Sequence, residues 1–333
     1  MSKIGILGAG TWGIALARML SNSGHDVTVW SAIDSEVDSL SAERRHKNLP
    51  GMVIPDAVRF TKEIGEVCAQ KDILLFAVPS VFVRSTARKA APFVPEGQII
   101  VDVAKGIEPD TLCSLTEVIR SEMQHTVELV ALSGPTHAEE VAQDLPTTIV
   151  SACANTAAAK KVQDVFMNTC LRVYTNPDVQ GVELCGALKN IIALGAGIAT
   201  GLGFGDNAKA ALITRGMAEI SRLGKAMHCT EQTFSGLAGI GDLIVTATSQ
   251  HSRNNRCGMY IGQGMAVGEA VKKVGMVVEG IHALPAAMRL SRRYHVEMPI
   301  VSAVNDIVNG GVDPKEAAAA LMNRDKTAEI LKS

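Results

Sequence analysis

A glycine-rich segment near the start of the chain has the spacing of a phosphate-binding turn. Gly8, Gly10 and Gly13 follow an apolar run over residues 4–7 and open a stretch with helical spacing that ends near Gly24. The first glycine would permit a tight turn, the second would let the backbone approach a pyrophosphate, and the third would let the helix pack close to the sheet. The amides at the start of that helix would face the phosphates. The alternative is a glycine-rich turn that binds no ligand. The position of this segment between a strand and a helix favours dinucleotide binding.

Several polar residues stand where a globular chain normally has apolar ones. Lys105 follows one predicted strand, and Gly134 and Thr136 follow the next, at the strand ends where ligands of doubly wound sheets bind. Lys189 interrupts the apolar segment GALKNIIALGAG, and lysines are rarely buried without a function. Asp242 lies in the glycine-rich segment GLAGIGDL, which indicates backbone packed tightly around a site. The alternatives are a lysine on the exposed face of an amphipathic helix and a structural turn capped by the aspartate.

A further segment has the composition of a phosphate-binding site. Ser252, Arg253 and Asn254 begin the run SRNNR, which can open a helix. A serine hydroxyl, two arginines and the free amides of a helix start can together hold a phosphate. A serine or asparagine cap with solvated arginines is an equally good interpretation of the local sequence.

The adenosine end of the dinucleotide site lacks a familiar feature. NAD-selective sites usually place an acidic residue near the end of the second strand, where it holds the ribose 2′-hydroxyl. Here the second predicted strand, residues 26–30, is followed by SAI before Asp34, and Asp34 is more typical of a helix cap. The basic run RRHK over residues 44–47 could contact a 2′-phosphate or be solvated. The sequence therefore favours NADP(H) over NAD(H), and catalytic efficiencies with NADPH and NADH would decide between them.

The elements that must position these residues fall into two parts. Up to residue 177, short β-branched runs alternate with helical stretches, which is typical of a parallel sheet covered on both faces. The predicted strands are residues 3–7, 26–30, 72–78, 99–103, 128–132, 148–151 and 171–174. Helices are expected from Pro109 onward and over residues 156–168, the second after an Asn155 cap.

After Pro177 the pattern is helical only. Over residues 208–223, for example, apolar side chains recur at helical spacing and should face a core; they are Ile213, Met217, Ile220 and Leu223. We therefore predict an α/β, doubly wound (Rossmann-type) parallel sheet in a dinucleotide-binding domain, residues 1–177. An all-α C-terminal domain, residues 178–333, would carry the substrate and catalytic groups.

The composition narrows the class of protein. The 333 residues suit two domains, 47% are hydrophobic, and 32 Lys and Arg nearly balance 34 Asp and Glu, so no broad surface for nucleic acid or an anionic membrane is expected. The seven scattered cysteines lack metal or redox spacing and indicate reduced thiols in a cytoplasmic protein without a metal site. The apolar stretch over residues 191–205 is shorter than the ~20 residues of a spanning helix, so we predict no membrane segment.

These segments together resemble the NAD(P)-dependent glycerol-3-phosphate dehydrogenases of the bacterial type. The likeness runs through nearly the whole chain in the ordered set GAGTWGIALA, LPG, FAVPS, VAKGIE, SGPTHAEEVA, GVELCGALKNIIALGAGI, GLAGIGDLIVT, SRNNR and VVEG. One departure concerns the adenosine side, where many relatives carry His or Arg shortly after the second strand and this chain has Ser31-Ala32. The resemblance implies hydride transfer between dihydroxyacetone phosphate and sn-glycerol 3-phosphate, a supply of glycerol 3-phosphate for phospholipids, and a homodimer.

The resemblance also implies roles for individual residues. The cofactor contacts, which include the three glycines of the turn, would be Gly8, Gly10, Thr11, Trp12, Gly13, Lys105, Ala138, Arg253, Val277 and Glu279. The substrate contacts would be Lys105, Gly134, Thr136, Lys189, Asn190, Asp242, Thr246, Ser252, Arg253 and Asn254. Lys189 would be the acid-base group, with Lys105 and Asp242 beside it, and burial next to Lys105 should lower the pKa of Lys189 toward the working pH.

Two other classes stay open from the sequence. One is another two-domain dehydrogenase of the 6-phosphogluconate or β-hydroxyacid type, which the SRNNR and GLAGIGD segments disfavour. The other is a dinucleotide-sensing regulator without turnover, in which Lys105, Lys189 and Asp242 would have no reason to converge. Consumption of reduced cofactor with dihydroxyacetone phosphate, with other ketoacids and without substrate separates all three.

Overall fold

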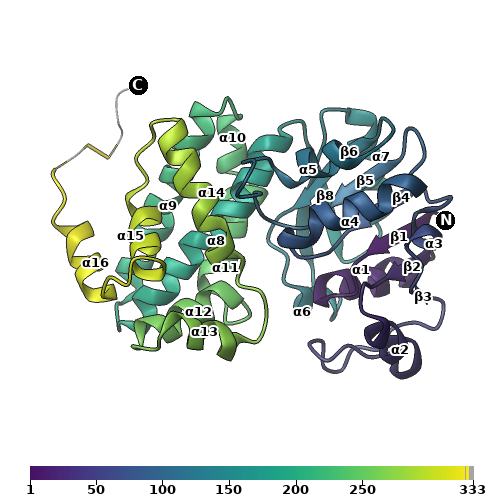
Figure 1. The fold of residues 1–333 in the computed structure, drawn as a ribbon, viewed down its shortest axis with the longest axis horizontal. Helices are drawn as coiled ribbons and strands as arrows, with labels where there is room; N and C mark the ends of the chain where they lie inside the picture. The colour runs from purple at the N-terminus through teal and green to yellow at the C-terminus, as the bar shows by residue number, and fades with distance from the viewer. Residues whose placement is uncertain (327, 330–333) are drawn as a thin grey trace.

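The computed structural model, which describes residues 1–326, 328 and 329, has a sheet region followed by a helical region (Figure 1). The sheet region holds eight strands in the order β3-β2-β1-β4-β5-β6-β7-β8. Their bounds are β1 Lys3–Leu7, β2 Asp26–Trp30, β3 Arg59–Thr61, β4 Ile73–Phe76, β5 Ile99–Asp102, β6 Glu128–Ser133, β7 Thr147–Ala152 and β8 Leu171–Asn176. All neighbours pair in parallel except β6 and β7, which are antiparallel, so the predicted doubly wound sheet is confirmed with one reversed pair.

The inner strands are apolar on both sides because helices cover both faces of the sheet, whereas the edge strands β3 and β8 carry exposed residues. On β4, Ile73 and Leu75 pack into one core while Leu74 and Phe76 pack into the opposite one, and all four side chains are fully buried. The covering helices are α1 Thr11–Asn22, α2 Asp34–Glu43, α3 Ile64–Cys68, α4 Val83–Ala90, α5 Leu115–Glu122, α6 Ala138–Val141 and α7 Thr156–Phe166. The two-sided burial explains why these strands read as continuous apolar runs.

The structure corrects two expectations about the elements. Strand β3 was missed because three residues at the edge of a sheet give no alternation to detect. The helix expected from Pro109 is wrong: it begins at Leu115, after a capping box between Ser114 and Glu117. Ser114 also pairs with Ile107 in an isolated β-bridge, so the intervening residues form a turn that closes back on itself.

The helical region is built around α8 (Val179–Gly201). The other helices are α9 Asp206–Ala226, α10 Glu231–Phe234, α11 Asp242–Thr248, α12 Arg253–Gly262, α13 Val267–Val274, α14 Glu279–Arg293, α15 Pro299–Val308 and α16 Pro314–Met322. A π-helical turn, η3 (Leu237–Gly241), leads directly into α11. Helix α12 crosses α8 so closely that a Cβ added to Gly258 would lie 2.1 Å from the carbonyl oxygen of Leu194, which is why only glycine fits there.

Helix α8 is long and apolar enough to cross a membrane by length and composition, and it exceeds the 191–205 stretch considered from the sequence. Its apolar window is completely buried inside the protein, because α9, α11, α12 and α14 contact it. The hydropathy of α8 therefore reflects the centre of a folded core. In α9, which flanks it, Met217, Ile220 and Leu223 are buried as predicted and Ile213 is partly buried.

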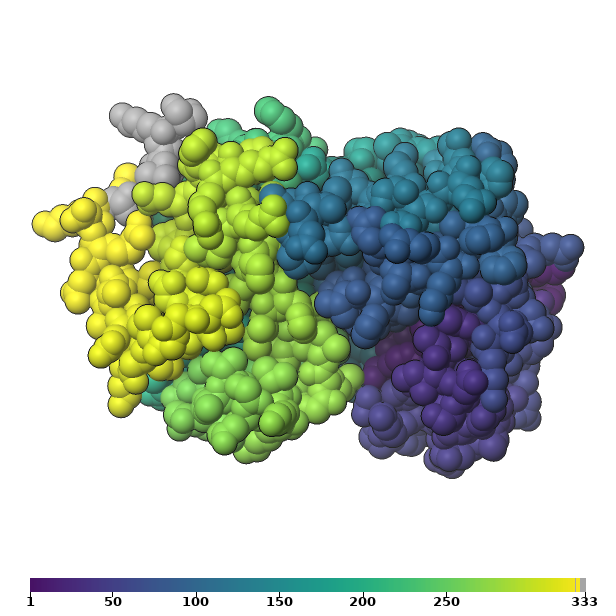
Figure 2. All heavy atoms as spheres, viewed as in Figure 1, coloured from purple at the N-terminus to yellow at the C-terminus, as the bar shows by residue number. Residues whose placement is uncertain are grey.

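The two regions meet along a seam that is visible in the space-filling view (Figure 2). The last strand ends at Asn176 and α8 begins at Val179, with the Asp178 side chain capping the helix through the amide of Gly181. Residues from both sides of this seam line a cavity of about 420 Å³. The side chains that could carry out chemistry line this cavity.

Candidate active site

Two lysines from different regions share one buried aspartate. Lys105 lies three residues after β5, Lys189 lies near the middle of α8, and Asp242 is the first residue of α11. Lys189 Nζ donates to Asp242 Oδ1 at 2.7 Å, and Lys105 Nζ donates to Asp242 Oδ2, also at 2.7 Å. Asp242 is only 1% exposed and Lys189 only 5%. Because a buried charge is stable only when it is paired, this cluster depends on all three groups.

Further hydrogen bonds fix the direction of each ammonium group. Lys189 Nζ also donates to Thr246 Oγ1, which in turn donates to the backbone oxygen of Asp242 at 2.6 Å, one helical turn earlier on α11. Lys105 Nζ donates to the backbone oxygen of Gly134 at 3.0 Å. The two lysines therefore reach the cavity from opposite regions with defined orientations.

The pKa of Lys189 lies at about 7, far below the ordinary value of 10.5 for a lysine. Burial is the largest cause, since it penalises the charged form, and the positive charge of Lys105 lowers the pKa further. The Asp242 carboxylate opposes both effects by favouring the ammonium form. Lys189 can thus both donate and accept a proton near neutral pH, which is what general acid-base catalysis requires.

The segment after α11 folds as a capped helix that presents basic groups to the cavity. Ser252 Oγ accepts from the amide of Asn255 at the start of α12, so the serine caps this helix, and it also lines the cavity. Arg253 lines the cavity too, and its pKa is lowered by burial although Glu279 partly compensates. An arginine, a hydroxyl and the start of a helix form a suitable site for a phosphate group.

Both polar atoms of the Asn254 side chain form hydrogen bonds within the protein, which its position in SRNNR does not predict. Its Nδ2 donates to Asn190 Oδ1 at 3.0 Å, and its Oδ1 accepts from the amide of Gly280 at 2.8 Å. It therefore ties α12 to α8 and to the start of α14. Asn190 and Asn254 both line the cavity, but their hydrogen bonds indicate that they also hold its walls in place.

The glycine turn fits a dinucleotide. Gly8 has φ +118° and lies so close to Ala77 that an added Cβ would be 2.8 Å from its carbonyl, whereas a Cβ on Gly10 would meet open space. Helix α1 begins directly after Gly10, and its first-turn amides have no acceptor within the helix. Across the seam, Glu279, which lines the cavity, accepts from the Ser80 hydroxyl at 2.6 Å and from its amide at 3.3 Å.

The structure brings most of the predicted site residues to one cavity. Those that line it are Gly10, Thr11, Trp12, Lys105, Thr136, Ala138, Lys189, Asn190, Asp242, Thr246, Ser252, Arg253, Asn254, Val277 and Glu279. Gly8, Gly13 and Gly134 are absent from the lining. Gly8 and Gly13 instead shape the turn, since an added Cβ on Gly13 would lie 2.2 Å from the Gly8 oxygen, and Gly134 orients Lys105.

Sequence reasoning missed several residues of the lining. His137 and His251, whose ring centroids are 5.8 Å apart, line the cavity, as do Glu36 and Asn48, and Asn48 donates to Thr11 at the glycine turn. His137 follows Thr136 in the SGPTHAEEVA segment and could have been inferred from it. The remaining residues carry no local signal, because only the tertiary fold places them at the cavity.

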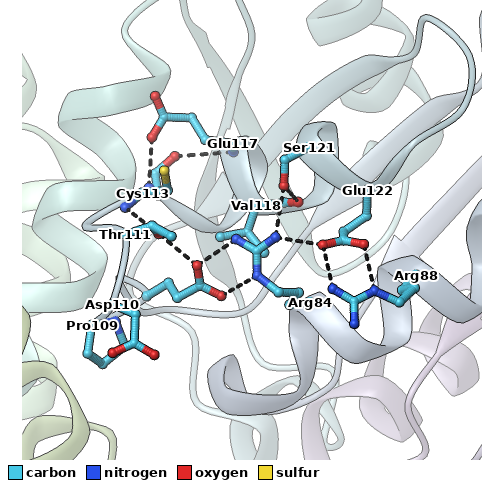
Figure 3. Close-up of polar contacts among 12 residues, drawn as sticks. Arg84, Arg88, Pro109, Asp110, Thr111, Cys113, Glu117, Val118, Ser121 and Glu122 are labelled. Carbon is cyan, nitrogen blue, oxygen red and sulfur yellow. Dashed lines mark hydrogen bonds and ion pairs between the residues drawn. The ribbon is translucent and has the colours of Figure 1, made fainter.

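A polar network supports the loop that carries Lys105 (Figure 3). Arg84 of α4 makes a two-pronged contact with Glu108, at 2.6 Å from Nε and 2.5 Å from Nη2, and also donates to Glu122 at 2.6 Å. Arg289 of α14 donates to the backbone oxygen of Asp110 at 3.3 Å. Paired guanidinium and carboxylate groups of this kind restrict direction as well as distance, so both regions hold the loop between β5 and α5.

A larger hollow of about 890 Å³ lies elsewhere, between α14, α15 and α16. Its lining residues include Arg292, Glu297 and Asp306, but neither the glycine turn nor the paired lysines. Size alone therefore does not identify the site, whereas the convergence of buried charged groups does.

The chain matches known proteins over nearly its whole length. Residues 3–159 match the model of the NAD-dependent glycerol-3-phosphate dehydrogenase N-terminus, and residues 178–319 match that of the C-terminus of the same family. A glycerol-3-phosphate dehydrogenase [NAD(P)+] of Lactobacillus delbrueckii subsp. bulgaricus is 68% identical, with 100% of both chains covered. One of Agathobacter rectalis is 53% identical, with 99% of this chain and 98% of the relative covered. The crystal structure of the glycerol-3-phosphate dehydrogenase of Coxiella burnetii has a TM-score of 0.93 at 35% identity, covering 97% of this chain and 99% of that one.

Proposed function

Because the chain belongs to the NAD-dependent glycerol-3-phosphate dehydrogenase family, we propose that its seam cavity is where dihydroxyacetone phosphate and sn-glycerol 3-phosphate are interconverted. The observation that carries this proposal is the sharing of Asp242 by Lys105 and Lys189 inside a cavity that also contains the glycine turn. The enzyme is an NAD(P)-dependent oxidoreductase.

The cofactor, when bound, supplies or accepts the hydride. The amides at the start of α1, after Gly10, would hold its pyrophosphate, as the positive end of a helix holds an anion. Trp12, Ala138, Val277 and Glu279 line the same cavity and would contact the rest of the dinucleotide. The open space next to Gly10 supports this placement.

Lys189 would act on the carbonyl oxygen of the substrate. During reduction, a hydride (one proton with two electrons) reaches C2, the C=O π bond breaks, and the oxygen becomes negative. The ammonium of Lys189 would donate a hydrogen bond to that oxygen and then transfer its proton, yielding the alcohol and a neutral amine that regains its proton from water. In the reverse direction the neutral amine would remove the hydroxyl proton. A pKa of about 7 suits both directions.

Asp242, Lys105 and Arg253 would provide position and electrostatics. Asp242 holds the Nζ atoms of both lysines, so it would aim Lys189 at the oxygen while Lys105 adds positive charge near the developing anion. Arg253 and Ser252 would bind the phosphate group. Binding energy from the phosphate, remote from C2, would then orient the carbonyl for the reaction.

The test is a spectrophotometric assay of NADH or NADPH consumption by the purified full chain. We expect turnover with dihydroxyacetone phosphate and none with 2-ketoacids or in a blank that lacks substrate. Turnover with a ketoacid instead would favour the other dehydrogenase class. Cofactor binding without turnover on any substrate would favour a sensing role and overturn the proposal.

We further propose a setting for the enzyme. It supplies sn-glycerol 3-phosphate for phospholipid synthesis in the cytoplasm, acts as a homodimer, and divides at residue 177 into cofactor and catalytic domains. The two family models, which match residues 3–159 and 178–319, support this division. Light scattering on the purified chain tests the dimer. The supply role is tested in a strain that lacks the gene. We expect this strain to stop growing and to grow again when glycerol 3-phosphate is added.

A further inference from the structure

The end of β2 carries an acidic group that the local sequence does not place there. The amide of Gly8 donates to the backbone oxygen of Trp30 at 2.9 Å, so the residue after Trp30 lies beside the glycine turn. That residue, Ser31, is buried, and its hydroxyl donates to Glu36 Oε2 at 2.5 Å. Ser31 Oγ also accepts from the amide of Ile33 at 3.2 Å, which fixes the direction of the hydroxyl.

Glu36 thereby lines the cavity next to the glycine turn. It shares the lining with Gly10, Thr11 and Asn48, and Asn48 Nδ2 donates to Thr11 Oγ1 at 3.2 Å. Among the described residues none donates to the second carboxylate oxygen of Glu36, so this oxygen is free to accept from a ligand. In dinucleotide folds the adenosine ribose lies beside the end of the second strand, where an acidic residue holds its hydroxyls.

The basic run that favoured a 2′-phosphate from the sequence is mostly directed elsewhere. Arg44 donates to the backbone oxygen of Val58 at 2.7 Å and lies 5.5 Å from the centre of the Phe60 ring, and neither it nor Arg45 lines the cavity. His46 does line it, but burial lowers its pKa and so disfavours the charged form. Lys47 is the cation that remains on this part of the lining, and it is exposed to solvent.

We propose that Glu36, held by Ser31, accepts the hydroxyls of the adenosine ribose and makes this chain select NADH over NADPH. This inference rests on the proposed dinucleotide site and concerns only its adenosine end. The 2′-phosphate of NADPH would bring close to two negative charges against the Glu36 carboxylate and would replace the hydroxyl that the carboxylate accepts from. This proposed selectivity for NADH is the opposite of the preference for NADP(H) that the basic run alone predicts.

The test measures binding, without substrate or turnover, by following the fluorescence of NADH and NADPH titrated with the full chain. We expect the Kd of NADPH to exceed that of NADH by about tenfold or more at low ionic strength, and the ratio to shrink as salt screens the repulsion. Glu36→Gln should lower this ratio about tenfold by weakening NADH and strengthening NADPH binding. A gain in NADPH affinity cannot result from misfolding.

Two further variants separate this role from general effects. Asp34→Asn removes the same charge from the first turn of α2, at a residue that is exposed and does not line the cavity, and should leave the ratio within about twofold of the parent because solvent screens its charge. Ser31→Ala keeps every charge but releases Glu36, and should weaken NADH binding.

The outcomes distinguish this inference from the proposed function. Tighter binding of NADPH than NADH by the parent, abolished by Lys47→Ala, would overturn the inference and leave the dehydrogenase assignment intact. An unchanged ratio in Glu36→Gln would overturn it as well. Failure of the parent to bind either dinucleotide would remove the proposed function, and this inference with it.

Discussion

Replacing Asp242 with asparagine removes the charge that two lysines share while keeping the size of the side chain. In the parent, the Asp242 carboxylate raises the pKa of Lys189 against burial and the charge of Lys105, and the balance lies at about 7. Asparagine leaves only the two lowering effects. We therefore expect the pKa of Lys189 in Asp242→Asn to fall below that of the parent.

The size of the effect follows from the protonation of Lys189. With a pKa of about 7, half of the parent molecules carry the ammonium form at pH 7. Loss of an opposite charge at 2.7 Å typically shifts a pKa by about 1–2 units, which leaves roughly a tenth to a hundredth protonated. Reduction of the ketone at pH 7 should then slow by about 5- to 50-fold from protonation alone, and further because Lys189 loses its orientation.

The assay is kcat for ketone reduction between pH 5 and 9, with thermal unfolding as a check on the fold. In the parent, kcat should decline above about pH 7, whereas oxidation of the alcohol should rise over the same range. In Asp242→Asn the decline should begin at lower pH, so part of the lost activity returns on acidification. Uncoupling one partner of a buried ion pair can also cost about 3–5 kcal/mol of stability.

Glu219→Gln is the matched control, since Glu219 is a buried carboxyl of α9 that does not line the cavity. It should leave the pH profile of kcat in place. A profile in Asp242→Asn that keeps the midpoint of the parent, with the protein folded, would refute the assignment of the pH dependence to Lys189.

Three other perturbations test separate parts of the reasoning. Lys189→Ala should lower kcat by about 10²- to 10⁴-fold with an unchanged Kd for the reduced cofactor, and near-normal turnover would exclude Lys189 as the acid-base group. Arg253→Ala should raise the KM for dihydroxyacetone phosphate at least about tenfold, whereas an unaltered KM would place the phosphate elsewhere. Glu219 accepts from the amides of Ile300 and Val301, and burial raises its pKa from 4.5 to about 7. Its contribution to stability is therefore complete below about pH 4.5 and is lost as pH rises through 7, by up to about 3 kcal/mol. Urea unfolding at pH 5 and 8 should show this loss in the parent and not in Glu219→Gln, and equal pH dependence in both would contradict it.

The sequence predicted the parts of this site that depend on local pattern. Gly8, Gly10 and Gly13 could be interpreted because a strand, a turn and a helix follow one another within a few residues. Lys189 was conspicuous because a charged residue interrupts an apolar helix, and its burial excludes the alternative of a lysine on an exposed helix face. Strand–helix alternation likewise predicted the sheet, because two-sided burial demands continuous apolar strands.

Contacts between distant segments could not be predicted in the same way. The sequence around Asp242 does not indicate that its two carboxylate oxygens accept from Lys105, which is 137 residues away, and from Lys189, which is 53 residues away. The same holds for Glu36, whose place at the end of β2 depends on the rotamer of Ser31 and on the path of α2. Strand β3 and the start of α5 were mistaken because a three-residue edge strand and a capping serine five residues after a proline give weak or competing local signals.

The buried position of α8 also has a consequence for how the chain is made. Helix α8 is complete once Gly201 has left the ribosome, but α14, one of the helices that covers it, ends at Arg293. At typical rates of synthesis of about 5–20 residues per second, these 92 intervening residues (293 − 201) take about 5–18 s. During that interval α8, which is long and apolar enough to cross a membrane, is not yet covered by all the helices that bury it in the folded protein. It also carries Lys189, on which turnover is proposed to depend. Nascent chains of this enzyme should therefore depend on chaperones most strongly between the emergence of α8 and that of α14.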